Sequence, residues 1–198
     1  MRIAVFASQT GTILQAIIDA CETGTLNATV VLVVSNNSGA EALRRASEHG
    51  IRAVHLSGRT HPDEGVLDRA IMLALKEADV EWVVLAGYMK KLGPETLSAR
   101  RFRVVNTHPA LLPKFGGQGF FGDAVHQAVL DAGETESGAT VHLVEGDYDT
   151  GPILSQVRVP VKPKDTVQTL KARVQNAERN LIVHTLMELS THKKAIGY

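Results

Sequence analysis

Residues 2–34 read RIAVFASQTGTILQAIIDACETGTLNATVVLVV, and this stretch decides the fold. Its first six residues form a short apolar run typical of a buried strand, and residues 28–34 form a second run that is almost continuously apolar and β-branched. A continuous run of this kind is typical of a central strand covered on both faces. Between the two runs, apolar residues recur at helical spacing. Strand, helix and strand in this order indicate a parallel pair joined by a crossover helix.

The same alternation continues along the chain. Further predicted strands cover residues 51–56, 82–86, 102–105, 139–144 and 153–159. Predicted helices cover residues 40–48, 62–78 with Pro62 in the first turn, 123–132 and 166–189, with a short one after Gly93-Pro94. The prediction is an α/β fold with one domain over residues 1–198: a doubly wound, mostly parallel, Rossmann-like sheet flanked by helices, with a small C-terminal portion of β-strand and long helix.

The composition narrows the class of protein. The 198 residues include 21 Lys and Arg against 21 Asp and Glu, and this zero net charge argues against binding nucleic acid through a broad basic surface. The single cysteine, Cys21, excludes an internal disulfide, and no CxxC pair indicates zinc. No apolar stretch approaches the roughly 18 residues that span a bilayer, and the N-terminal run lacks a signal-peptide cleavage site. We therefore expect a cytoplasmic protein with no metal and with neither nucleic acid nor membrane as partner.

Three loops are predicted at the carboxyl edge of the sheet, where open parallel sheets bind ligands. The first loop, residues 8–12, precedes the first helix. Backbone N–H groups at a helix N-terminus suit an anion such as phosphate, and Gly11 allows its close approach. A tight turn with Thr10 or Thr12 as the helix cap is the alternative.

The other two loops carry polar residues suited to catalysis. Asn106 and His108 lie two residues apart at a strand end, so their side chains face one way if the strand continues. An amide beside an imidazole suits the stabilisation of an oxyanion and the supply of a proton. The third loop, residues 146–152 (GDYDTGP), offers a carboxylate on a turn that could hold His108 in its charged form. The alternative interpretation is that these are ordinary loop and turn residues with no catalytic role. An aspartic-protease site is excluded, because Asp-Thr-Gly occurs once and the pattern is not all-β.

The remaining polar residues give weaker signals. His142 alternates with apolar neighbours in a strand, which favours a packed histidine. On the last helix a polar stripe, which is usually a solvated face, contains Lys171, Gln175 and Glu178. Metal-ligand spacing is absent among the other histidines, which are His49, His55, His61, His126, His184 and His192.

Three runs of sequence closely resemble the folate-dependent formyltransferases: VNTHPALLP at residues 105–113, YDTGPIL at 148–154 and AGYMKKL at 86–92. The similarity extends over nearly the whole chain. The family uses 10-formyltetrahydrofolate as its one-carbon donor. The chain length and the segment RVQNAE, residues 173–178, are most similar to members that formylate the amine of 5-phosphoribosylglycinamide in de novo purine biosynthesis. The resemblance therefore implies this transferase activity, with 10-formyltetrahydrofolate as co-substrate and no metal.

The resemblance also implies roles for single residues. Asn106 and His108 would polarise the formyl oxygen, with His108 as general acid, and Asp149 would keep His108 charged. The phosphoribosylglycinamide substrate would contact Gly11, Thr12, Ile13, Gln175 and Glu178. The folate would contact Met89, Lys90, Lys91, Leu92, Leu97, Asn106, Glu145, Gly146 and Asp147. The bond between Leu112 and Pro113 is expected to be cis.

The resemblance further implies a phosphate-binding half, residues 1–105, and a catalytic and folate-binding half, residues 106–198, in a monomer or homodimer that acts on small molecules. The chain departs from the family in the phosphate loop, where Gln9, Thr12 and Ile13 replace Gly, Ser and Asn. This departure leaves open a formyltransferase that acts on another small amine, such as an amino sugar. A non-catalytic folate- or nucleotide-binding module is a further alternative, but it would not require Asn106, His108 and Asp149 together.

Overall fold

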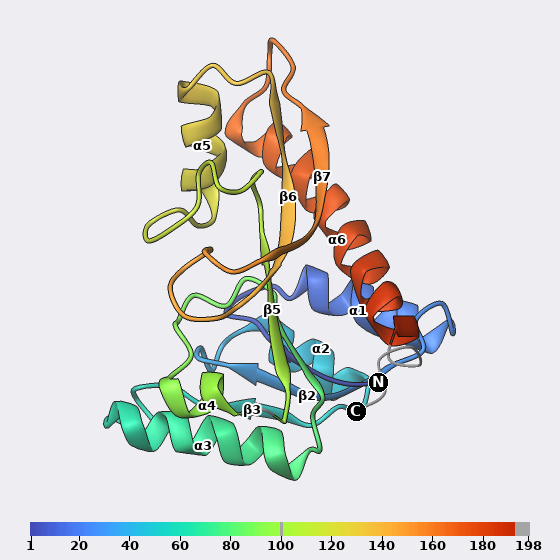
Figure 1. Cartoon of the computed structure of the whole chain (residues 1–198), viewed down its shortest axis with the longest axis vertical. Helices are drawn as coiled ribbons and strands as arrows, with labels where there is room; N and C mark the ends of the chain where they lie inside the picture. Colours follow the sequence, from blue (N-terminus) through green and yellow to red (C-terminus); the bar gives the residue numbers. More distant parts are fainter. Residues whose placement is uncertain (100, 193–198) are drawn as a thin grey trace.

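A computed structural model describes residues 1–99 and 101–192, and its centre is one seven-stranded sheet in the order β3-β2-β1-β4-β5-β6-β7 (Figure 1). The strands are β1 (Arg2–Phe6), β2 (Thr29–Ser35), β3 (Ala53–His55), β4 (Trp82–Leu85), β5 (Arg103–His108), β6 (Glu136–Leu143) and β7 (Ile153–Pro160). Strands β1 to β5 pair in parallel, whereas β6 and β7 pair antiparallel. The predicted doubly wound, mostly parallel sheet is confirmed.

Helices cover both faces of this sheet, because its central strands are apolar on both faces. They are α1 (Thr12–Glu22), α2 (Glu41–Glu48), α3 (Glu64–Glu77), α4 (Pro94–Ser98), α5 (Asp123–Asp131) and α6 (Val167–His192). One core joins α1, α2 and α6 to one face, and a second joins α3 and α4 to the other. A third cluster, which includes Val129 and Leu170, packs α5 and α6 against β6 and β7. The long helix α6 therefore runs beside both the parallel and the antiparallel part of the sheet (Figure 1).

The structure differs from the prediction at several element boundaries; β6, for example, begins at Glu136 and not at residue 139. The strand predicted over residues 102–105 continues to His108, because β6 pairs with residues 105–108 and completes their hydrogen bonding. Pro62 lies outside α3: Asp63 is the N-cap, and its side chain accepts a hydrogen bond from the N–H of Val66 at 2.8 Å. The peptide bond between Leu112 and Pro113 is cis, as expected. None of the described helices has the length and apolar character needed to cross a lipid bilayer.

Candidate active site

The start of α1 borders a cavity of about 370 Å³ at the carboxyl edge of the sheet. Gly11 is the N-cap residue, with a φ of 68°, and no side chain caps the helix. Neither Thr10 nor Thr12 is therefore the helix cap that the alternative interpretation expected. Gly11, Thr12 and Ile13 line the cavity. The side chain of Ile13 is only 9% exposed and packs in the core, so the backbone N–H is its polar group at this loop. Uncapped N–H groups at a helix N-terminus suit an anion.

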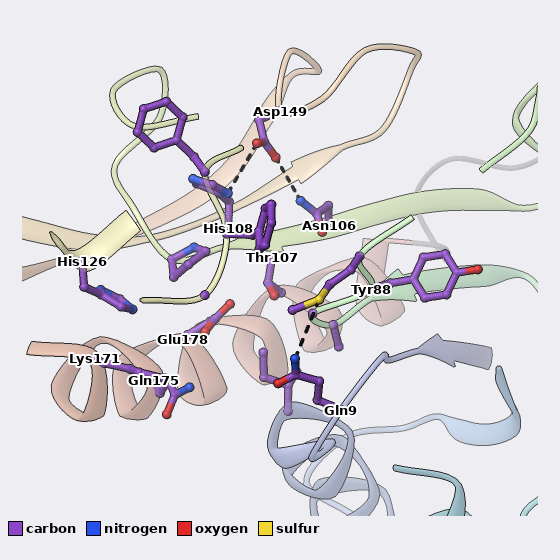
Figure 2. A pocket seen from close by; sticks show the side chains of 18 of the residues that line it. Gln9, Tyr88, Asn106, Thr107, His108, His126, Asp149, Lys171, Gln175 and Glu178 are labelled. Carbon is purple, nitrogen blue, oxygen red and sulfur yellow. Dashed lines mark hydrogen bonds and ion pairs between the residues drawn. The ribbon is translucent and has the colours of Figure 1, made fainter. Parts of the chain in front are cut away.

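Asn106, His108 and Asp149 converge on the wall of the same cavity (Figure 2). The Asp149 carboxylate accepts a hydrogen bond from Asn106 Nδ2 at 3.2 Å through Oδ1, and its Oδ2 lies 3.4 Å from His108 Nδ1. The backbone N–H of Gly117 donates to Oδ2 at 2.9 Å. The loop between β6 and β7 thus brings Asp149 to a residue 43 positions earlier in the chain. The three residues proposed for catalysis lie together.

Burial controls the ionisation of this group. His108 is 4% exposed, and its Nε2 donates to the carbonyl of Phe115 at 2.7 Å. Burial lowers the pKa of His108, and the attraction of Asp149 and the Phe115 carbonyl offsets this only in part. Asp149 thus lies where the prediction puts it, beside Nδ1 of the ring, and its charge favours the protonated imidazole while burial opposes it. Burial raises the pKa of Asp149, but hydrogen bonding and charge from its partners prevail, so the pKa is lowered and the carboxylate is ionised.

His142 belongs to the same cluster. It lies opposite Asn106 in the β5–β6 register, with Nε2 3.1 Å from Asn106 Nδ2 and 3.3 Å from Asp149 Oδ1. Its Nδ1 donates to the carbonyl of Leu143 at 2.8 Å. His142 is buried, as predicted, but its contact with the catalytic candidates was not predicted. The alternating pattern of β6 indicated only that His142 is packed in a strand. Its contact with Asn106 depends on the register between β6 and β5, which is a feature of the tertiary structure.

The polar stripe on α6 lines the cavity and is partly to fully buried. Lys171, Gln175 and Glu178 all line the cavity, and Glu178 is 5% exposed. The solvated-face interpretation is wrong for Glu178, because α6 packs on β6 and α5 and this packing turns its side chain inward. Burial raises the pKa of Glu178 to about 7, although the Thr107 hydroxyl and neighbouring Arg179 act in the opposite direction.

Most of the residues expected to bind folate line two hollows beside the cavity. Met89 lines the cavity itself. A groove of about 1150 Å³ and a small hollow of about 60 Å³ share Lys90, Lys91, Leu92, Leu97 and Gly146 in their walls. The small hollow also reaches Asn106 and Asp147. Lys91 Nζ lies 2.9 Å from Asp147 Oδ1, and this ion pair connects the segment after β4 to the loop between β6 and β7. Glu145 lines neither hollow.

His126 lines the cavity as well, although no feature of the sequence indicated that it belongs to the site. It is buried on α5, and its Nδ1 has no hydrogen-bond partner. Burial lowers its pKa to about 4, so the ring is neutral. Its sequence neighbours carry no chemical signal that would have distinguished it. Among the residues that the structure describes, no group of three or more His, Cys, Asp or Glu side chains is placed to hold a metal ion.

Comparison with known proteins identifies similar sequences and structures. The family described as formyl transferase matches residues 1–186. The chloroplastic phosphoribosylglycinamide formyltransferase of Arabidopsis thaliana is 38% identical over 186 residues, which are 93% of this chain and 64% of that protein. The phosphoribosylglycinamide formyltransferase of Haemophilus influenzae is 37% identical over 177 residues, 89% of this chain and 81% of that protein. The crystal structure of phosphoribosylglycinamide formyltransferase from Bacillus halodurans superposes with a TM-score of 0.89 at 36% identity, covering 99% of this chain and 97% of that one.

Proposed function

Because the chain belongs to the formyl transferase family, we propose that it transfers the formyl group of 10-formyltetrahydrofolate to the amine of 5-phosphoribosylglycinamide, in de novo purine biosynthesis. The convergence of Asn106, His108 and Asp149 on one cavity carries the proposal. The names of the similar proteins support the choice of substrate. In this proposal residues 1–105 supply the phosphate site, and residues 106–198 supply the catalytic trio.

The two substrates enter from opposite sides of the trio. The phosphate of the amine substrate binds the backbone N–H groups of Gly11, Thr12 and Ile13, where the helix dipole favours an anion. Its glycinamide end lies along α6, beside Gln175 and Glu178. The folate co-substrate lies along residues 89–92 and the loop at 145–149, where the small hollow reaches Asn106.

Formyl transfer requires stabilisation of the oxyanion that forms when the amine attacks the formyl carbon. Asn106 Nδ2 and the protonated ring of His108 donate hydrogen bonds to this oxygen, and Asp149 stabilises the imidazolium as it forms. Since Nδ1 faces Asp149, Nε2 is the nitrogen that serves the substrate, after it leaves the carbonyl of Phe115. One donor of this kind contributes about 2.7–4 kcal/mol to transition-state stabilisation.

A second candidate function is formyl transfer to another small amine, such as an amino sugar. The buried side chain of Ile13 favours it, because this phosphate loop lacks the side-chain donor of an Asn at that position.

An absorbance assay of folate deformylation separates the two candidates. The wild-type protein is given 10-formyltetrahydrofolate with phosphoribosylglycinamide or with amino-sugar acceptors, and kcat/KM is compared. The proposal expects turnover with phosphoribosylglycinamide and competition by inorganic phosphate. Turnover with amino sugars alone would reverse the order of the two candidates.

A further inference from the structure

Asp68 of α3 carries a buried carboxylate on the wall of the large groove, and the residue is only 4% exposed. Its Oδ2 accepts a hydrogen bond from the backbone N–H of Glu95 at 2.7 Å, and its Oδ1 accepts one from the backbone N–H of Thr96 at 3.1 Å. The Thr96 hydroxyl, which is itself fully buried, also donates to Oδ1. Burial of a charged group is unfavourable unless hydrogen bonds of this kind satisfy it. The carboxylate of Asp68 is therefore bound to the start of α4.

Helix α4 depends on this contact, because its own sequence supplies little stability. It has only five residues, and a helix of that length is not stable alone in water. Its N-cap residue, Gly93, has no side chain to cap it, and Pro94 has no N–H. A Cβ added to Gly93 would overlap the Asp68 carboxyl group, which occupies the place of a side-chain cap. Asp68 thus caps α4 from 27 positions earlier in the chain, and the two helices lie side by side (Figure 1).

The segment held in this way is a wall of the hollows that the proposed function gives to the folate. Leu92 and Leu97, which flank the capped residues, line both the groove of about 1150 Å³ and the small hollow of about 60 Å³. Leu92 belongs to the apolar core beneath α3 and α4, and Leu97 packs against it. The small hollow also reaches Asn106 of the catalytic trio. The position of residues 92–97 therefore determines where a bound folate lies relative to the catalytic residues.

We propose that Asp68 is a positioning residue for the folate co-substrate, which fixes residues 92–97 in the conformation that binds it. This inference rests on the proposed function, because it takes the groove and the small hollow as the folate site. Without the carboxylate, the N–H groups of Glu95 and Thr96 lose their acceptor, and residues 92–97 populate conformations that do not fit the ligand. The apparent affinity for a ligand falls with the fraction of protein in the binding conformation. Loss of Asp68 therefore weakens folate binding and leaves the chemical step intact.

The first test is Asp68→Asn, measured by steady-state kinetics with each substrate varied in turn. Asn keeps the shape of the side chain, but in either orientation its NH₂ group faces one of the two N–H donors, so a hydrogen bond to α4 is lost. Loss of one hydrogen bond to a charged group changes an equilibrium by roughly 10- to 150-fold. KM for 10-formyltetrahydrofolate should rise by about tenfold or more, with KM for phosphoribosylglycinamide and kcat at saturating folate little changed. An unchanged KM for the folate, or an equal rise in both KM values, would overturn the inference.

The second test observes the start of α4 without turnover. Hydrogen exchange followed by NMR reports the backbone N–H groups of Glu95 and Thr96, which are hydrogen-bonded to Asp68 in the wild type. In Asp68→Asn both should exchange about tenfold faster or more, because the segment opens more often. Added tetrahydrofolate should restore protection, since it binds only the ordered wall. Unchanged exchange together with weakened folate binding would show that Asp68 does not act by holding α4, and would contradict the proposal.

Thr96→Val is a milder variant that keeps the inference testable if Asp68→Asn folds poorly. Valine has nearly the shape of threonine and keeps the backbone N–H, so the variant removes only the hydroxyl donor to the carboxylate. KM for the folate should rise in Thr96→Val as well, but by less than in Asp68→Asn, with KM for the amine unchanged. A Thr96→Val protein with the wild-type KM for the folate and wild-type exchange at Glu95 would count against the cap as the positioning element.

Gly50→Ala is the control for general loss of stability. Gly50 follows α2 and has a φ of 67°, and a Cβ added to it would have no atom within 4 Å, so alanine there adds strain without a clash. It should lower Tm and leave both KM values unchanged, and a rise in KM for the folate as large as that of Asp68→Asn would refute a specific role of the cap. Failure of the wild-type protein to deformylate the folate would reject the proposed function. An active wild type whose KM for the folate is unaltered in Asp68→Asn would reject only this inference.

Discussion

Replacing Gly11 by alanine tests whether the start of α1 is the phosphate site. Gly11 has a φ of 68°, a left-handed conformation that costs a residue with a Cβ roughly 1–2 kcal/mol. The new Cβ would lie 2.8 Å from Cβ of Ala42, and relieving such overpacking costs about 1–3 kcal/mol more. The total is about 2–5 kcal/mol, and a domain of this size loses roughly 2–4 °C of Tm per kcal/mol. We expect Tm to fall by about 4–20 °C.

The same clash moves the backbone that faces the substrate. Loss of one hydrogen bond to a charged phosphate costs about 1.5–3 kcal/mol, which is roughly 10- to 150-fold in affinity. Below the unfolding temperature, Gly11→Ala should therefore raise KM for phosphoribosylglycinamide by at least about tenfold and leave KM for the folate unchanged. Steady-state kinetics with each substrate varied in turn, beside thermal unfolding, measures both effects.

Gly24→Ala is the matched control. Gly24 follows α1 and has a φ of 73°, and a Cβ added to it would have no atom within 4 Å, so alanine there adds strain without a clash. It should cost about 1–2 kcal/mol and leave both KM values unchanged. If Gly11→Ala changes KM for the amine no more than Gly24→Ala does, the start of α1 does not bind the phosphate.

Three further variants test the site. His108→Ala should lower kcat by about 100- to 1,000-fold with little change in KM, and steady-state kinetics would exclude His108 from the mechanism if kcat stayed near wild type. Asp149→Asn should lower the pKa of His108 further, because it removes the charge that opposes burial; an unchanged midpoint in an NMR titration of the ring contradicts this. Folding lowers the pKa of Asp149, so its ionised carboxylate stabilises the folded protein above about pH 4. This stability is lost as the pH falls through the lowered pKa. The difference in unfolding free energy between wild type and Asp149→Asn should therefore shrink below about pH 4. Ile13→Asn should lower KM for the amine by about tenfold or more and also lower Tm, since it trades core contacts for a phosphate donor, and an unchanged KM speaks for the other acceptor amines.

The sequence by itself determined the elements and part of the site. Continuous apolar runs, β-branched in the second case, mark β1 and β2 without reference to the rest of the chain, because a strand covered on both faces is apolar on both faces. Asn106 and His108 lie on one side of a strand because of their spacing alone. The family motifs then indicated Asp149, which no local periodicity connects to β5.

Only the tertiary structure decided burial and contact between distant segments. The i, i+4, i+7 pattern of α6 is the same for an outer and an inner face, and packing on β6 and α5 turned Glu178 inward. The pairing of β6 with β5 placed His142 against Asn106. The ionisation of His108 likewise depends on desolvation by segments far apart in the sequence, which outweighs the attraction of Asp149. Each of these features sums contributions from several elements, and therefore no single stretch of sequence contains it.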